Sequence, residues 1–454
     1  MFRIESLKNN GSYYRKGIFY SSNKNTHMKI NNSAIQSIAK EYGTPSYIYD
    51  GDQLVKNYKN LVNALPNFVD VFYALKVNPN VSLVRLLRNH GACTEVCSIT
   101  EMEIALKAGA TPEDIIYLGP CKKDYELKRA ISLNIFAIVV ESEIELERVS
   151  SFAKDLGVVA NVAIRINPDF SAEGSPWKMG GRPTHFGIEE QHAIQYFREY
   201  LNTPNVNVKG IHVYNGTNIL EASSVYENTK YILGLYDKIV QMYNCKFTMV
   251  DVGGGMGVPY FNNQKELDIE EFKALMVPLF SKFNQKYPDT RIIMESGRFI
   301  AGTAGYLAVT VNNIKVNHGK TFLVTDGGTN CHSAAAGSGR VVKRNFPMQN
   351  ISAPKDSTNR VVYQVSGPLC SPDDIIGRNM ELKEAKVSDV LLVAFSGAYG
   401  PSSSPGLFHS HGFPSEVLMY QNKSYLIRES DTTLDIMNKQ IMVDVQHHDE
   451  LILN

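Results

Sequence analysis

The sequence has no excess of charge of either sign, since its 454 residues include 46 lysines and arginines against 46 aspartates and glutamates. No net field is therefore present to attract nucleic acid or an anionic membrane surface. Long apolar runs are also missing: the longest spans about six residues (135–140), whereas a membrane helix needs about 20. The opening MFRIESLKNNGSYYRKG is polar and shows no secretory pattern. We expect a cytoplasmic protein that binds neither nucleic acid nor membrane.

Paired cysteines are absent as well. The six cysteines, at 93, 97, 121, 245, 331 and 370, form no CxxC motif and are spread too widely for a disulfide scaffold or a zinc site. Free thiols in a reducing cytosol are the simplest interpretation. Cys370 stands out because SGPLCSPDD places it between a Gly-Pro turn and two acidic residues, although an ordinary buried cysteine is the alternative.

What the chain does have is a pattern that repeats eight times between residues 46 and 304. A short apolar, β-branched run ends in a polar or glycine-rich turn, and an amphipathic stretch with helical spacing follows. The eight runs are 71–76, 92–96, 115–119, 135–140, 159–167, 208–214, 247–255 and 291–297. Strands that alternate with helices predict a parallel sheet with crossover helices. Eight units in this length favour a (β/α)₈ barrel, with a doubly wound open sheet as the alternative.

The pattern of apolar runs changes after residue 305. Short strand-like runs such as YLAVTVNNIKVN, KTFLVTDGG and VVYQVSGPL follow one another with little helix between them, which is typical of an all-β region, and residues 340–360 resemble a loop. We predict an N-terminal segment (1–45) that joins this region, a barrel (46–304) and a C-terminal β domain (305–454). The fold class is therefore α/β plus all-β.

Charged residues and glycines close nearly every predicted barrel strand. The active site of such a barrel lies at the C-terminal ends of its strands, so these residues would meet in one place. Lys76 ends an apolar strand, where partial desolvation would lower its pKa and free its amine for Schiff-base chemistry. A lysine that only marks a strand end is the alternative. The strand-end residues are Lys76, Glu95, Gly119, Glu141, Arg165, Asn167, His212, Tyr214, Gly253–Gly255, Glu295 and Arg298.

Two motifs at these strand ends suit a phosphorylated ligand. In VDVGGGMGVP the glycines let backbone N–H groups approach a phosphate, and the spacing departs from the dinucleotide-binding GxGxxG. In ESGR, Glu295 can keep a pyridine nitrogen protonated while Arg298 meets a phosphate. A surface salt bridge is the alternative interpretation of ESGR.

Taken in order, FYALKVNPN, GIHVYNGT, VDVGGGMGVPY, MESGRFIAGTAG, SGPLCSPDD and SGAYG resemble the fold-type III pyridoxal-phosphate decarboxylases, which include diaminopimelate and ornithine decarboxylases. The likeness runs over essentially the whole chain. It implies pyridoxal phosphate as cofactor and a homodimer with shared active sites. Lys76 and Cys370 would then be catalytic, as the Schiff-base lysine and as the acid that protonates the substrate carbon after CO₂ leaves.

The resemblance also implies binding residues. For the cofactor these are Lys76, Glu95, Arg165, His212, Tyr214, Thr217, Gly254, Gly255, Glu295, Gly297, Arg298 and Tyr399. For the substrate they are Asp326, Ser371, Asp374 and Tyr399, and no metal is implied. Tyr214 stands where the family has a histidine that stacks on the cofactor, so either Tyr214 or His212 is expected to face the ring.

The substrate loops depart from the diaminopimelate enzymes. Those enzymes have a glutamate directly after the catalytic cysteine, where this chain has Ser371, and an arginine near a stretch that here contains Ser333 and two alanines. A distal charge without a partner would be costly. The sequence looks closest to the branch that decarboxylates glutamyl groups on an acyl carrier protein, and a basic loop with Arg340, Lys343 and Arg344 could meet such a carrier. A solvated turn is the alternative for that loop.

Four alternatives remain open at this point, and one of them is a plain β/α scaffold that binds no cofactor. The enzyme could be a meso-diaminopimelate decarboxylase despite these departures. An amino-acid racemase with a related barrel would need a second acid or base rather than the Cys370 loop. A small non-catalytic carrier of pyridoxal phosphate would lack the C-terminal β region.

Overall fold

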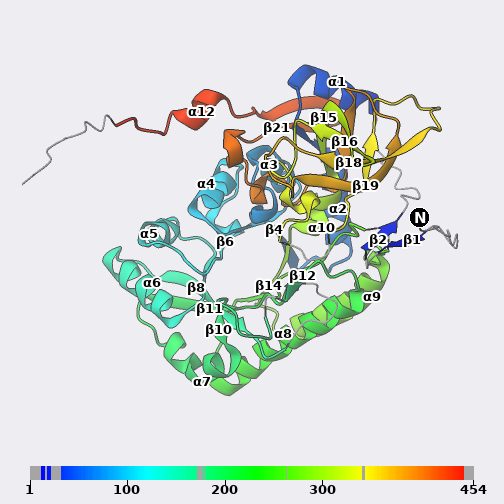
Figure 1. The fold of residues 1–454 in the computed structure, drawn as a ribbon. Helices are drawn as coiled ribbons and strands as arrows, with labels where there is room; N and C mark the ends of the chain where they lie inside the picture. The colour runs from blue at the N-terminus through cyan, green and yellow to red at the C-terminus, as the bar shows by residue number, and fades with distance from the viewer. Residues whose placement is uncertain are drawn as a thin grey trace, which may run out of the picture.

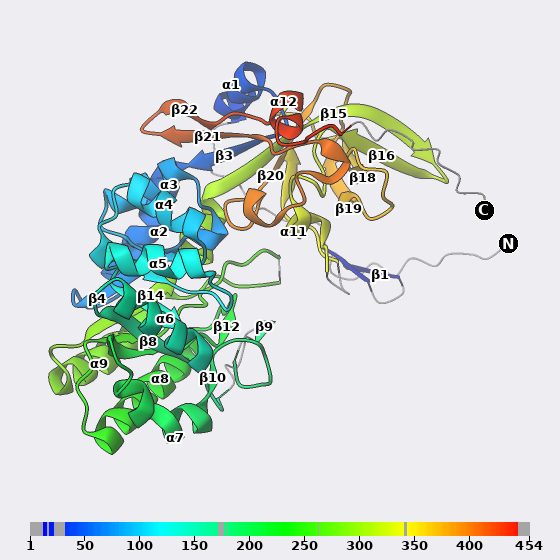
Figure 2. The ribbon, with the colours of Figure 1, turned by 90° about the vertical axis from the view of Figure 1, so that its left-hand side faces the viewer.

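The computed structural model describes residues 32–170, 180–261, 263–339 and 343–443, together with the backbone of 12–15, 18–21 and 177–178. Figures 1 and 2 show two lobes: a barrel coloured blue to green, and a sheet-rich lobe coloured yellow to red that also takes in blue α1 and β3. Two ranges make up this second lobe, 32–50 and 305–443, and we call it the β domain. No helix among the described residues has the length and apolar character to cross a membrane.

The barrel contains all eight predicted strands, every one parallel to its neighbours. In barrel order they are β4 (Val69–Ala74), β5 (Cys93–Val96), β6 (Ile115–Tyr117), β7 (Ala137–Val140), β8 (Ala160–Asn167), β11 (Val206–His212), β13 (Met249–Asp251) and β14 (Arg291–Ser296). The barrel closes because β14 also pairs with β4, in a register that joins Glu295 to Phe72. The (β/α)₈ prediction is confirmed, and the open-sheet alternative is wrong.

Helices cover the outside of the barrel. They are α2 (Gly51–Asn63), α3 (Val81–Arg88), α4 (Ile99–Lys107), α5 (Asp124–Leu133), α6 (Glu143–Asp155), α7 (Glu190–Leu201), α8 (Ala222–Tyr243) and α9 (Ile269–Lys286). Side chains alternate along each strand, so Phe72 joins an inner cluster with Ile116 and Met249, while Val71 and Tyr73 face the helix layer. The inner cluster fills the barrel, and the strand ends remain free to carry polar groups.

The β domain is built on a second sheet of mainly antiparallel strands. Its strand order is β19 (Ile375–Lys383), β18 (Arg360–Ser366), β16 (Lys320–Thr325), β15 (Gly305–Asn317), β3 (Ser46–Asp50), β21 (Ser415–Tyr420) and β22 (Lys423–Arg428), and β20 (Val390–Val393) joins β15 to β17 (Met348–Asn350). The residues predicted as a loop at 340–360 therefore include one short strand. Near the N-terminus, β1 (Ser12–Arg15) and β2 (Ile18–Ser21) form a separate antiparallel hairpin.

Strand β3 shows where the two domains meet along the chain. It pairs with β15 and β21, and helix α1 (Asn32–Tyr42) packs over it with Ile35 and Ile38 in a cluster that includes Ile48. The predicted limit between residues 45 and 46 would have assigned β3 to the barrel. Because its hydrogen bonds lie in the second sheet, we propose a limit after Asp50 instead.

The β domain is bonded directly to the barrel strand end that carries Lys76. The backbone N–H of Tyr399 donates to the carbonyl of Val77 at 2.8 Å, and the hydroxyl of Ser402 donates to the same carbonyl at 3.0 Å. Asn78 donates to the carbonyl of Gly397 at 3.3 Å. The loop after β20 is thereby held over the mouth of the barrel.

Candidate active site

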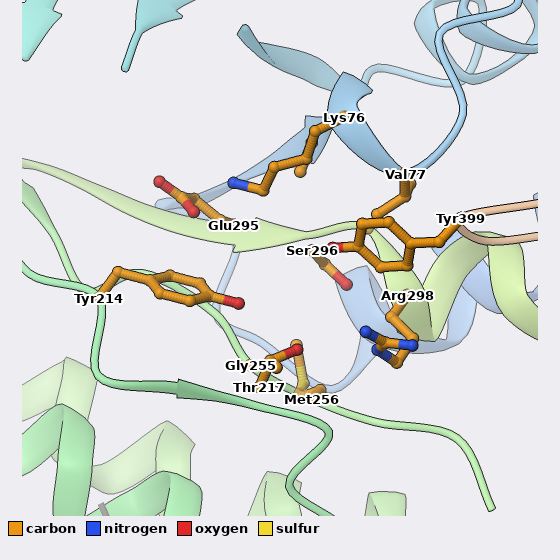
Figure 3. Close-up of a pocket in the computed structure, with 12 residues that line it drawn as sticks. Lys76, Val77, Tyr214, Thr217, Gly255, Met256, Glu295, Ser296, Arg298 and Tyr399 are labelled. Carbon is orange, nitrogen blue, oxygen red and sulfur yellow. The ribbon is translucent and has the colours of Figure 1, made fainter. Parts of the chain in front are cut away.

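A pocket of about 290 Å³, open to solvent, lies at the C-terminal ends of the barrel strands, under the loop that carries Tyr399. Figure 3 shows the amine of Lys76 and the hydroxyls of Tyr214 and Tyr399 directed into one space, with Arg298 on its far side. The pocket is lined by Ala74, Lys76, Val77, Tyr214, Thr217, Gly255, Met256, Glu295, Ser296, Gly297, Arg298 and Tyr399. Eight residues that the sequence assigned to a cofactor site are therefore brought together here.

Lys76 lies in a short 3₁₀ turn (Leu75–Val77) that follows β4, and its amine is paired with Glu95. The Nζ atom donates to both carboxylate oxygens of Glu95, at 2.9 and 3.0 Å. Glu95 is fully buried and also accepts from the thiol of Cys97 at 3.0 Å. Burial lowers the pKa of Lys76, but Glu95, Cys97 and Glu295 outweigh it and hold the pKa well above its ordinary value.

The expectation of a lowered pKa at Lys76 is therefore wrong for the protein described here. Desolvation alone would favour the neutral amine, whereas a buried carboxylate in direct contact favours the ammonium ion. The sequence shows that the strand end is apolar but cannot show how closely Glu95, from the next strand, approaches it. Before Lys76 can react as a nucleophile, its proton must pass to another group.

Tyr214, and not His212, lines the pocket. The amine of Lys76 lies 5.4 Å from the centre of the Tyr214 ring. His212 is completely buried behind the pocket, where its Nε2 lies 3.0 Å from Oε1 of Glu295. Tyr214 lies two residues beyond the end of β11 and is the one of the two that lines the pocket, and its contact with a cofactor ring stays a prediction.

The opposite end of the pocket is suited to an anion. Arg298 begins helix α10 (Arg298–Ala301); its Nη1 donates to the hydroxyl of Tyr260 at 2.9 Å, and its guanidinium lies 4.6 Å from the ring centre of Tyr399. Gly254 and Gly255 follow β13, and a Cβ on Gly254 would lie 2.0 Å from the carbonyl oxygen of Glu295. Gly255 has φ +105°, a left-handed conformation that favours glycine.

Pyridoxal phosphate fits these residues. Two buried polar atoms at the pocket, Oγ of Ser296 and Nε of Arg298, have no hydrogen-bond partner among the residues that the structure describes. Buried polar groups are normally satisfied, so a polar ligand is the natural complement. Glu295 suits a ring nitrogen, Arg298 and the glycine backbone suit a phosphate, and Lys76 suits an aldehyde.

Some predicted cofactor residues lie just behind the pocket wall. Arg165 donates from Nη1 to Oε1 of Glu141 at 2.7 Å, and both side chains are buried. Glu141 also accepts from the backbone of Gly119 and Gly187. Arg165 lowers the pKa of Glu295 and Glu95 raises the pKa of Lys76, so both act on residues that line the pocket. A direct contact of either with the cofactor stays a prediction.

The four residues predicted from the β-domain loops, apart from Tyr399, lie outside the described lining of this pocket. Cys370 is exposed, and Ser371 beside it is half-buried. Asp374 is buried and accepts from the backbone of Thr329 at 2.6 Å and of Leu369 at 2.8 Å. Asp326 accepts from the hydroxyl of Thr44 at 2.5 Å and from the backbone of Thr310 at 2.8 Å. Within one chain, Asp326 and Asp374 hold the β domain together, and their role toward substrate stays a prediction.

The sequence analysis missed two residues that support the site. Asp251, completely buried at the end of β13, accepts from the backbone of Gly253 at 2.8 Å and lies beside Glu295. Tyr260 holds Arg298 through its hydroxyl and is the last residue of the motif VDVGGGMGVPY, which was noted only for its glycines. For Asp251 a signal was available, because a carboxylate flanked by valines on a buried strand needs a specific partner.

Comparisons with known proteins agree with this geometry. A family model described as the pyridoxal binding domain of pyridoxal-dependent decarboxylases matches residues 51–302. The chain is 34% identical over 420 residues to the L-glutamyl-[BtrI acyl-carrier protein] decarboxylase of Niallia circulans, which covers 92% of this chain and 98% of that protein. It is 30% identical over 417 residues to the diaminopimelate decarboxylase of Methanocaldococcus jannaschii, with 89% and 93% covered.

Solved structures show the same architecture. The crystal structure of the M. jannaschii diaminopimelate decarboxylase in co-complex with L-lysine superposes with a TM-score of 0.82 at 28% identity, covering 96% of this chain and 98% of that one. The diaminopimelate decarboxylase from Helicobacter pylori complexed with L-lysine gives 0.80 at 26% identity, with 89% and 98% covered.

Proposed function

Because the chain belongs to the family of pyridoxal-dependent decarboxylases, we propose that its pocket removes the α-carboxylate of a glutamyl group carried as a thioester by an acyl carrier protein. The chain is a carboxy-lyase that uses pyridoxal phosphate. The relative from Niallia circulans acts on such a carrier-bound glutamyl group, and its similarity extends over nearly the whole of both chains. This similarity is the observation that carries the substrate proposal.

Two segments of the β domain, one before and one after the predicted catalytic cysteine, agree with an uncharged distal group. Ser371 stands directly after Cys370, and α11 (Ser333–Ala336) consists of a serine and three alanines. Ser333 is itself bonded to the backbone and side chain of the loop at 403–404. An ionised distal carboxylate without a partner in a closed site would cost roughly 3–5 kcal/mol. In a thioester that carboxylate is already neutral, so no arginine is needed.

The chain's own groups divide the chemistry between them. Bound pyridoxal phosphate supplies an electron sink for the pair left behind by CO₂. Glu95, bonded to the amine of Lys76 through both oxygens, is placed to accept the proton that the amine must lose before it reacts. Tyr214 offers an aromatic face on one side of the pocket, and Arg298 with the Gly254–Gly255 backbone offers donors for a phosphate.

We further propose a homodimer in which Cys370 acts in the site of the second subunit. The supporting observation is that Cys370 is exposed in a loop of the β domain, away from the pocket formed by its own chain. A thiol that must protonate a substrate carbon has to lie at the reacting atom. A second copy of the chain can bring it there by symmetry.

The proposed location is the cytoplasm. All six cysteines lie in the described part of the chain with free thiols, four of them exposed or partly exposed at 97, 121, 245 and 370. Thiols of this kind persist in reducing compartments.

The basic loop proposed to meet the carrier protein is described only in part. Arg340 lies outside the described residues. Lys343 pairs with Asp373 at 2.5 Å, and Arg344 lies 5.2 Å from the ring centre of Phe261. Lys343 already has an acidic partner within the chain, so Arg344 is the better candidate for contact with an acidic carrier.

The second candidate function is decarboxylation of meso-diaminopimelate, which the 30% identity to the M. jannaschii enzyme favours. Membership of the decarboxylase family makes an amino-acid racemase the weaker choice. The β domain removes the small cofactor carrier from consideration, since such a carrier would lack it.

The deciding experiment measures CO₂ release by the purified enzyme with glutamate bound to an acyl carrier protein, with free glutamate and with free meso-diaminopimelate. We expect turnover of the carrier-bound substrate at least about 100-fold above the other two. Free glutamate and free diaminopimelate each carry a distal charge, and burying that charge without a partner is costly. Lys76→Ala supplies the background rate. Faster turnover of diaminopimelate would refute the substrate proposal and leave the family assignment unchanged.

A further inference from the structure

Three buried side chains from adjacent strands meet behind the pocket. His212 ends β11, Asp251 ends β13, and Glu295 lies near the end of β14. At most 1% of each residue is exposed. One polar atom of each lies within 4.8 Å of the others. Of the three, only Glu295 lines the pocket. His212 and Asp251 therefore contact Glu295 from the side away from the pocket.

Two carboxyl groups this close in a buried place cannot both carry a full negative charge. Burial is the largest influence on both and raises the pKa of each, and the charge of Glu295 raises that of Asp251 further, to well above its ordinary value. The cations Lys76 and Arg165 and a hydrogen bond from Asp251 act against burial and lower the pKa of Glu295. This balance favours a proton on Asp251 and the negative charge on Glu295.

The position of that proton follows from the backbone. Oδ1 of Asp251 accepts from the N–H of Gly253 at 2.8 Å, whereas Oδ2 has no other partner in the described part of the chain. Oδ2 is thus the atom that carries the proton and donates it. Its neighbour Oε2 of Glu295 is likewise buried and receives no hydrogen bond from a backbone or nitrogen donor among the described residues.

His212 supplies the second hydrogen bond. Burial, together with the charge of Arg165, holds the pKa of His212 well below its ordinary value, so the ring is neutral. Because Oε1 of the Glu295 anion can only accept, Nε2 of His212 carries the hydrogen across their 3.0 Å contact. The other charged groups that act on the cluster are Lys76, Glu95 and Glu141.

We propose that Asp251 is a positioning residue, which donates a hydrogen bond from Oδ2 to Glu295 and, with His212, orients that carboxylate toward the ring nitrogen of pyridoxal phosphate. The proposal rests on the proposed function of the pocket. Two neutral donors leave Glu295 its negative charge but lower its affinity for a proton. A proton shared between Glu295 and a ring nitrogen therefore stays on the nitrogen, which is the state in which the ring accepts electrons.

Two substitutions of near-equal size separate this role from simple packing. In Asp251→Asn the amide oxygen can still accept from Gly253, and the amide N–H can still donate to Glu295, as the neutral acid does. In Asp251→Leu both bonds are lost. We expect the affinity of the cofactor-free protein for pyridoxal phosphate, measured by fluorescence titration, to change less than about 3-fold in the first variant and to fall about tenfold or more in the second.

The infrared spectrum of the cofactor-free protein tests the proton directly. A protonated, buried carboxyl gives a carbonyl stretching band that ionised carboxylates lack. We expect Asp251→Asn to remove such a band and Asp70→Asn to leave it, because Asp70 on β4 pairs with Arg291 at 2.5 Å. This measurement stands even if Asp251→Leu fails to fold.

Retention of the band in Asp251→Asn, or an affinity as poor as that of Asp251→Leu, would overturn the assignment. A wild-type protein that binds no pyridoxal phosphate would instead refute the proposed function. In that case the infrared measurement on the unloaded protein would still decide whether Asp251 holds the proton.

Discussion

At the scale of single residues, Tyr214 lines the pocket at a position where the resemblance to the family predicts a histidine. A tyrosine keeps an aromatic face on the pocket, and its ring lies 5.4 Å from the amine of Lys76. A hydrogen bond with Thr217 lowers the pKa of the Tyr214 hydroxyl, although burial, the largest influence, raises it overall. The hydroxyl is thus a neutral group, so the ring face is the part of Tyr214 that we expect to matter for cofactor binding.

We predict that Tyr214→Phe binds pyridoxal phosphate within about 3-fold of wild type, whereas Tyr214→Ala binds about tenfold more weakly, since only the latter removes the aromatic contact. Titration of the cofactor-free protein, followed by absorbance, measures both. A loss in the Phe variant equal to that in the Ala variant would show that the hydroxyl, and not the ring, is the important part.

At the scale of elements, the turn after β13 depends on a close backbone approach. Any Cβ at Gly254 would overlap the carbonyl oxygen of Glu295 at 2.0 Å, so the two strand ends can adjoin only without a side chain there. This closeness brings the glycine N–H groups and the Glu295 carboxylate into one pocket.

We predict that Gly254→Ala lowers stability by about 2 kcal/mol or more and weakens cofactor binding, because the backbone must move. The matched control is Gly234→Ala in α8, where an added Cβ meets nothing within 4 Å and should stabilise the helix by about 1 kcal/mol. Denaturant unfolding of both variants measures the difference. Equal effects at the two glycines would contradict the packing argument.

The start of helix α4 carries a group that titrates near neutral pH. Burial is the largest influence on Glu101 and raises its pKa to about 7. Its carboxylate accepts from the backbone of Cys97 at 2.7 Å, and Glu95, which accepts from the Cys97 thiol, raises the pKa further. Between the unfolded value of 4.5 and about 7, the folded protein holds a proton that the unfolded chain has released.

Stability therefore falls as the pH rises through that window, by roughly 3 kcal/mol at most from this group. We predict that Glu101→Gln flattens the decline between pH 4.5 and 7, since glutamine cannot ionise. Urea unfolding at several pH values, with wild type alongside, provides the test. An unchanged slope in the variant would place the titration on another group.

At the scale of the whole molecule, the proposed dimer places Lys76 and Cys370 of different chains in one site. If each site takes its lysine from one subunit and its cysteine from the other, two inactive variants can complement each other. We predict that an equal mixture of Lys76→Ala and Cys370→Ala, dissociated and reassembled, regains about a quarter of wild-type activity, because half of the dimers are mixed and one of their two sites is intact.

Either variant alone, taken through the same dissociation, serves as the control and should stay inactive. Activity that fails to return in the mixture, while sizing shows that mixed dimers form, would place both residues of a site on the same chain.

Several features were predictable from the sequence because they depend on local pattern. Eight apolar runs, each followed by helical spacing, predicted the eight barrel strands, and all eight are present. Lys76, Glu295 and Arg298 were singled out because parallel strands end on one side of a barrel, which makes strand-end residues neighbours whatever the details of packing.

Other features depended on contacts between distant segments. Closure of the barrel rests on the pairing of β14 with β4, and β3 pairs with strands more than 250 residues away. Burial and carboxylates on neighbouring strands together raise the pKa of Asp251, and neighbouring carboxylates hold the pKa of Lys76 above its ordinary value although burial lowers it. The sequence alone determined which elements form and where the polar groups stand along them, because periodicity and strand order are local. Only the tertiary structure decided which charges meet, since Coulomb interactions and desolvation depend on distances that no local pattern contains.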